Sequence, residues 1–250
     1  MTDLAAASPS TLLRPRRHVA IRVVGVLLAL VLLVVFAALP SLLTPWAVPA
    51  DAGGHGWPRT PEAHRWADSA AAILMTVVGL GALLVARSPR ARSGLTAWVA
   101  VCLLVFAISS TASELIQGRS GFLTASLIGA VTALVMAGPL VAASPQRAAV
   151  VRGGERETTG PTGLVRTLLG AMVLASVALM AAAVFWRLSG GVIEDAREDD
   201  VVSFVGLGAC CALGSLIALQ GREGWRSVAL LLALVAGYAG VATASLLALG

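Results

Sequence analysis

Seven apolar segments, each close to the length that crosses a lipid bilayer, divide this chain of 250 residues. A helix needs roughly twenty residues to span about 30 Å of hydrocarbon, and irregular backbone cannot face lipid because its polar groups would lack partners. Hydrophobic residues make up 58% of the chain and charged residues 12%, more apolar surface than a soluble core can hide. The sequence therefore predicts an all-α, polytopic transmembrane helical bundle. We expect its spans at 18–40, 69–87, 95–116, 122–143, 164–187, 201–220 and 226–249.

These segments predict a simple domain organisation. Residues 1–17 form a short cytoplasmic tail, 18–250 form a single seven-helix domain, and 44–68 form a cap loop on the outer face. The apolar run from Val23 to Leu39 exceeds the usual length of a signal-peptide core, which favours an uncleaved first span. Cleavage near Ala52 would leave six spans instead.

The distribution of arginine predicts the orientation. With the N-terminus inside, thirteen of the eighteen arginines lie on the cytoplasmic side, where positive loops are retained, and five lie outside. We therefore expect a cytoplasmic N-terminus and an extracellular C-terminus. The net charge of +5 is spread over short helix flanks and forms no single basic surface, so we expect the lipid bilayer and no nucleic acid as a partner.

Two residue types are absent from the chain: it has no lysine and no asparagine. Both have A-rich codons, and their absence indicates a GC-rich bacterial genome and hence a bacterial plasma membrane. A chain without lysine cannot hold retinal as a Schiff base. The three histidines, His18, His55 and His64, lie in flanks or loops, which argues against haem or zinc within the spans. We expect no cofactor.

A short internal repeat suggests a duplication. The stretch 78–82, Val-Gly-Leu-Gly-Ala, recurs at 205–209, and at the same offset Trp98 matches Trp225. This pattern suggests three helices, a connecting helix and three more in the same orientation, as in carriers built from parallel repeats. The alternative is coincidence in a chain rich in these residues. Pairs such as Ala236 and Gly240 also have the four-residue spacing at which helices pack closely, within the bundle or against a partner subunit or second copy.

Among the ionisable side chains, Glu114 comes closest to being a charge within a predicted span, because the arginines lie at the span ends. Glu114 is near the outer end of the third span, together with Ser110, Ser113 and Gln117. Ionisable groups in a membrane are costly and mark functional sites by default. These four residues form a candidate polar site that faces an outward cavity and binds a proton or cation; the alternative is an interfacial carboxylate paired with Arg119 or Arg187.

The outer loop holds a second candidate cluster, which consists of His55, His64 and Asp68. His64 and Asp68 are four residues apart, so a helix would place both on one face. Zinc or copper binding is one interpretation. The other, which we favour, is that Asp68 stabilises a helix N-terminus while nearby tryptophans anchor in the headgroup region, with no metal bound.

The sequence Gly118-Arg119-Ser120-Gly121 resembles the GxSG motif of rhomboid intramembrane proteases. On that resemblance Ser120 corresponds to the nucleophile. The family also needs a histidine base in its sixth core helix, and residues 201–220 contain no histidine. A serine without a base is a poor nucleophile, so the resemblance implies at most a catalytically inactive relative.

The sequence leaves two classes of function open. The first is a non-enzymatic membrane subunit or scaffold, suggested by the small-residue faces and the scarcity of buried charge. The second is a small-solute or ion carrier that uses a polar cavity near Glu114. A membrane enzyme is less favoured than either class, because the sequence places no nucleophile and general base together on one side of the bundle.

Overall fold

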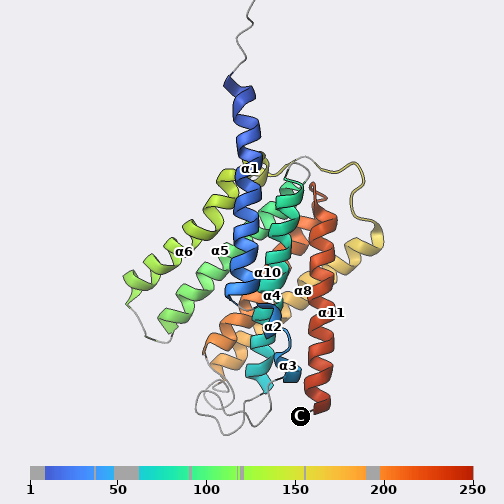
Figure 1. Ribbon diagram of the computed structural model, residues 1–250. Helices are drawn as coiled ribbons and strands as arrows, with labels where there is room; N and C mark the ends of the chain where they lie inside the picture. The colour runs from blue at the N-terminus through green and yellow to red at the C-terminus, as the bar shows by residue number, and fades with distance from the viewer. Residues whose placement is uncertain are drawn as a thin grey trace, which may run out of the picture.

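The computed structural model describes residues 9–36, 38–47, 62–89, 92–116, 118, 121–154, 156–189 and 198–249. These residues form a bundle of helices and contain no β-strand (Figure 1). The predicted fold class, an all-α bundle of membrane-spanning type, is confirmed.

Seven helices longer than twenty residues carry the seven predicted segments. They are α1 (Pro9–Leu30), α4 (Glu62–Arg87), α5 (Ser93–Ile116), α6 (Phe122–Ala143), α8 (Gly163–Leu188), α10 (Glu198–Leu219) and α11 (Trp225–Leu249). The shorter elements are the π-helix η1 (Val31–Val35), α2 (Ala38–Ser41), α3 (Thr44–Ala47) and α7 (Arg147–Arg152).

Over the residues that the structure describes, six of these helices are long and apolar enough to cross a membrane. In α5 the described apolar stretch is Ser93–Ser109, and the side chain that follows it, Ser110, lies outside the description. The count of seven crossings is therefore not confirmed and stays a prediction. Helix α4 begins at Glu62, so residues 62–68, expected in the cap loop, belong to a helix.

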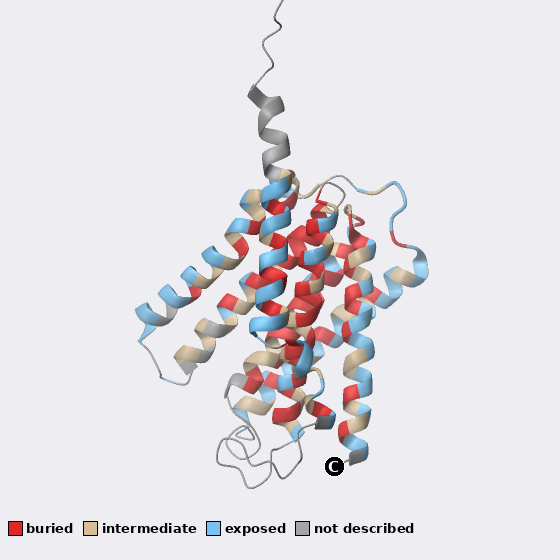
Figure 2. Ribbon diagram, in the orientation of Figure 1, coloured by how far each residue is buried: buried red, intermediate tan, exposed pale blue. Residues whose placement is uncertain are grey.

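Helices α4 and α10 lie at the centre of the bundle. In each of these two helices, 67% of the apolar membrane-spanning stretch is buried. The buried share is 28% for the first span and for α11, 19% for α6 and 17% for α8. Figure 2 shows the buried residues concentrated in this centre, while α6 and α8 diverge from it and are largely exposed.

The two helices that carry the repeated pentapeptide, α4 and α10, have corresponding packing partners. Helix α4 packs against α1 and α11, and α10 packs against α8 and α5. A duplicated three-helix unit would give these helix pairings. The glycines at equivalent positions of the repeated pentapeptide have different neighbours, however: an added Cβ would touch Leu33 of η1 at Gly79 and Ser109 of α5 at Gly206. The duplication itself stays a prediction.

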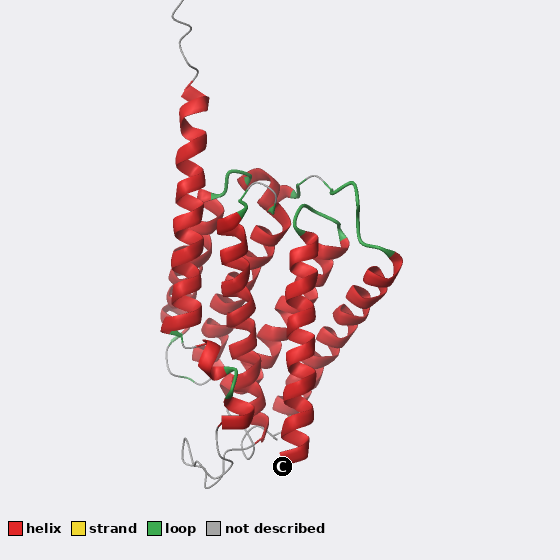
Figure 3. Ribbon diagram, turned by 45° about the vertical axis from the view of Figure 1, so that its right-hand side comes forward, coloured by secondary structure: helices red, strands yellow, loops and turns green. Residues whose placement is uncertain are grey.

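The two chain ends lie at opposite ends of the bundle. Figures 1 and 3 both show α1 starting beyond one end, which we call the upper end, and α11 finishing at the other, the lower end. An odd number of crossings requires this arrangement. Which end faces the cytoplasm stays a prediction.

Hydrogen bonds fasten the upper end. The backbone N–H of Gly94 donates to the Glu223 carbonyl over 2.8 Å, and that of Gly224 donates to Glu157 Oε1 over 2.9 Å. Trp225 Nε1 donates to the Thr159 carbonyl over 3.2 Å. The turn between α10 and α11 depends on Gly224, whose positive φ of 86° is a conformation that other residues rarely adopt. The start of α5, the turn before α11 and the segment before α8 are thereby joined.

Candidate functional site

A cavity of about 340 Å³ lies between α4, α5, α6 and α10. Most of its wall is apolar. The polar side chains on the wall are Ser109, Glu114 and Ser203. The remaining lining residues are Ala71, Leu74, Met75, Val105, Phe106, Ile128, Val202 and Gly206.

Glu114 lies on the wall of this cavity, and its role as a proton or cation site stays a prediction. Its predicted companions Ser110, Ser113 and Gln117 fall outside the described side chains. Ser109 of α5 and Ser203 of α10 supply the hydroxyl groups that are seen. Sequence reasoning missed Ser203, which is remote from Glu114 in the chain and carries no signal of its own in an apolar helix.

The packing of α5 on α10 shapes this cavity. Trp98 of α5 donates from Nε1 to the Cys210 carbonyl of α10 over 3.1 Å, and an added side chain at Gly214 would collide with the Trp98 ring. Further along α10, an added Cβ at Gly206 would approach only Ser109 Oγ, at 3.3 Å. The two helices are therefore in close contact at Trp98 and less closely packed at Gly206, where an added Cβ would still lie tightly against Ser109.

The second candidate cluster contains a buried pair that links two helices. His64 Nδ1 of α4 lies 2.7 Å from Asp200 Oδ1 of α10, and both side chains are more than nine-tenths buried. Asp68 Oδ2 lies 3.8 Å from His64 Nε2, and the Asp68 side chain is 51% exposed. The prediction that His64 and Asp68 share a helix face is confirmed, while Asp200 was not among the predicted residues.

Metal binding gains no support from this cluster. Its third predicted member, His55, lies outside the described residues. Within the described ranges, no group of three or more His, Cys, Asp or Glu side chains is arranged to hold a metal ion. The observed role of His64 and Asp200 is to join α4 to α10.

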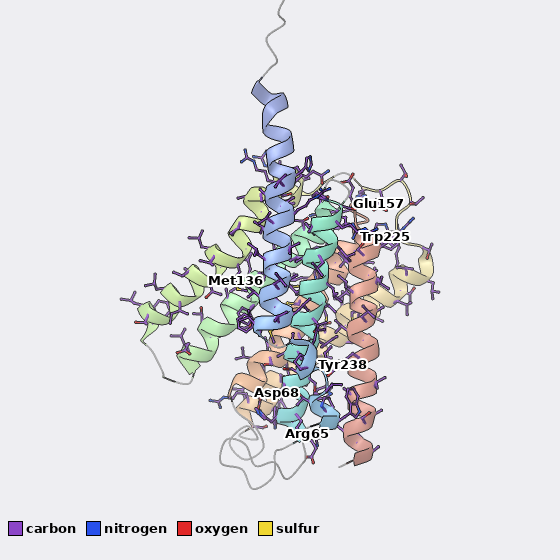
Figure 4. All side chains as sticks on the ribbon, in the orientation of Figure 1. Arg65, Asp68, Met136, Glu157, Trp225 and Tyr238 are labelled. Carbon is purple, nitrogen blue, oxygen red and sulfur yellow. The ribbon has the colours of Figure 1, made fainter. Side chains whose placement is uncertain are left out.

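Further hydrogen bonds fasten the lower end. Arg65 donates to the Pro45 carbonyl over 2.6 Å, and Tyr238 donates from its hydroxyl to the Leu42 carbonyl over 2.8 Å. Trp66 Nε1 donates to Thr243 Oγ1 over 2.8 Å. Figure 4 shows Arg65 and Tyr238 toward the lower end, and Glu157 and Trp225 at the upper end. Helices α4 and α11 are thus tied together, and each is also tied to the α2–α3 segment.

The motif that resembles a rhomboid site is only partly described. Gly118 has a positive φ of 62°, and an added side chain at Gly118 or Gly121 would meet nothing within 4 Å. Ser120 and Arg119 lie outside the described residues. The resemblance therefore stays an expectation from the sequence.

Comparison with protein-family models, with curated proteins and with solved structures gave no match for this chain. Its class is therefore defined by the fold and the site geometry alone. They establish a protein with several long apolar helices of membrane-spanning type.

Proposed function

We propose that this chain is a non-enzymatic membrane subunit with a fixed helical core. The observation that carries the proposal is the fastening of the core at both ends. At the lower end His64 is paired with Asp200 over 2.7 Å, and at the upper end Gly94 is bonded to Glu223 over 2.8 Å. A carrier that alternates between two openings must separate its helices at each end in turn, and these buried contacts oppose that motion.

The partner we propose for this subunit is a second copy, packed through α11. Ala233, Gly237, Gly240 and Ala244 are exposed and follow one another at spacings of four, three and four residues. Helices approach closely in lipid where small residues have this spacing, and a twofold contact pairs a surface with itself. Core glycines such as Gly81 lie against neighbouring side chains, whereas added side chains at Gly237 and Gly240 would meet nothing within 4 Å.

Subunit counting tests this proposal. The full chain, labelled with one fluorophore and reconstituted in dilute lipid vesicles, should bleach in two steps. Gly240→Leu should shift most particles to one step, because the larger side chain holds the α11 helices apart. The matched control is Gly170→Leu on α8, where an added side chain also meets open space. A single step for the unmodified chain, or two steps for Gly240→Leu, would contradict the proposal.

A small-solute or ion carrier is the second candidate, and the cavity at Glu114 is the observation that favours it. A carboxylate on a cavity wall can bind a proton or a cation and release it to one side. The test is proton or cation flux into dye-loaded proteoliposomes. If the chain is a carrier, the unmodified chain should show flux, and the Glu114→Gln variant should show less. Flux that is absent, or equal in both forms, would exclude this candidate.

A further inference from the structure

We propose that the cavity between α4, α5, α6 and α10 is a binding site for a small lipophilic cation, with Glu114 as its counter-ion. This inference rests on the cavity and on neither function proposed above, because a bundle can hold a ligand without carrying it.

The size and lining of the cavity fit a small apolar molecule. Its volume of about 340 Å³ falls within the range of roughly 300–1,000 Å³ that ligand pockets occupy. Side chains such as Leu74, Met75 and Val105 form most of the wall, and burial of apolar ligand surface against them is favourable. The space at Gly206 arises because α10 has no side chain there.

The polar part of the wall selects a positive charge. Glu114 is the ionisable side chain among the described lining residues, and Ser109 and Ser203 add hydroxyl oxygens. An attraction between opposite charges is stronger in an apolar surrounding than in water. Phe106 contributes an aromatic ring, whose face also attracts cations. A neutral molecule of the same shape would gain only the apolar contacts, and an anion would be repelled.

The bilayer is the route that the structure favours for entry. Among the described lining residues, α6 contributes Ile128, whose side chain is itself 43% exposed. Helix α6 is also one of the two least buried long helices in the described part of the chain. A ligand that dissolves in lipid can therefore approach along the exposed surface of α6, which is why we assign a lipophilic cation and not a hydrated metal ion.

The test is equilibrium binding of tritiated phenyltrimethylammonium to the full chain in lipid nanodiscs. The competitors are the unlabelled cation and tert-butylbenzene, which has the same shape with carbon in place of the charged nitrogen. We expect saturable binding that the cation displaces and the neutral isostere does not displace at equal concentration.

Two variants locate the site. Glu114→Gln should weaken binding at least tenfold, and Gly206→Leu, which fills the cavity, should abolish it. The matched controls are Glu62→Gln, an exposed carboxylate at the start of α4, and Gly170→Leu on α8, where an added Cβ meets nothing within 4 Å; both should bind normally.

Three results would overturn the assignment: no saturable binding to the unmodified chain, equal displacement by tert-butylbenzene, or normal binding by Glu114→Gln. The isostere comparison uses the unmodified chain, so it decides the matter even if a variant fails to fold. None of these three results depends on the number of copies counted in vesicles.

Discussion

The central helices α4 and α10 and the peripheral helices α6 and α8 are equally apolar but differently placed. Their mean hydropathies over the spans are 2.3 and 2.2 for the central pair and 2.0 and 2.4 for the peripheral pair. Their buried shares are nevertheless 67% for each central helix and 19% and 17% for the peripheral ones. Apolarity therefore does not decide which helix is central.

Small residues and polar contacts contribute to the difference. Lipid is as apolar as a leucine side chain, so helices in a membrane associate through close packing and hydrogen bonds. Glycines of the central helices, such as Gly81 and Gly208, have neighbours within 3 Å of an added Cβ, whereas Gly170 of α8 has none within 4 Å. Gly129 of α6 is an exception among the peripheral helices, because an added Cβ there would collide with Thr111 of α5. The buried His64–Asp200 pair also joins the two central helices.

The largest effect is expected from Gly208→Ile. An added Cβ would lie 2.6 Å from Met180 Cγ and 2.9 Å from the Ser176 carbonyl oxygen, so α10 and α8 must separate. The loss in free energy of unfolding should reach about 3 kcal/mol, the upper part of the usual range for overpacking. Reversible unfolding in mixed micelles measures it. Gly170→Ile is the matched control. Equal losses for the two variants would show that Gly208 is packed no more tightly than Gly170, which would contradict the contrast between central and peripheral helices.

A smaller loss is expected when the buried pair is broken. His64→Ala or Asp200→Ala leaves one buried polar group without its partner, which should cost about 1–3 kcal/mol of unfolding free energy. The double variant should lose less than the sum of the two single losses. Asp68→Ala should lose no more than about 1 kcal/mol, because its side chain is 51% exposed and 3.8 Å from His64. Additive losses in the double variant would show that the pair does not join the helices.

Tyr238→Phe should have a still smaller effect. It removes one hydrogen bond, from the Tyr238 hydroxyl to the Leu42 carbonyl, and keeps the ring that packs near Trp46. The expected loss in the same unfolding assay is about 1 kcal/mol. A loss above about 3 kcal/mol would mean that this bond holds the α2–α3 segment far more firmly than its partly buried position implies.

The smallest effect is expected on the exposed surface of α8. Ala182→Leu should change the free energy of unfolding by less than about 0.5 kcal/mol, because residue 182 is exposed and a larger side chain there has room. A loss comparable with that of Gly208→Ile would show that α8 is covered by a partner and would remove the contrast between centre and periphery.

The sequence predicted the helices well because each carries its own signal. Six of the seven predicted segments match long helices, while the first, 18–40, begins in α1 and continues through η1 into α2. The shared face of His64 and Asp68 follows from their spacing of four. The start of α4 was placed too late, since the polar residues of 62–68 look like loop. Their side chains are instead accommodated by contacts from elsewhere, such as the Pro45 carbonyl that receives Arg65.

Contacts between distant segments carried no such signal. Asp200 lies 136 residues from His64, and nothing in a run of acidic residues marks the member that a helix will bury. Ser203 reaches the cavity wall only because α10 packs on α5. The charge of Glu114 thus pointed to a candidate site, whereas Ser203 carried no comparable signal.

The fixed core is tested most directly by distances between spin labels at its two ends. With the native cysteines replaced, one pair of labels at Glu62 and Leu247 reports the lower end of α4 and α11, and a second pair at Arg87 and Leu230 reports the upper end; all four sites are exposed. In lipid nanodiscs a fixed core predicts one narrow distance distribution for each pair. Two populations, with one end widening as the other narrows, would contradict it and favour a carrier.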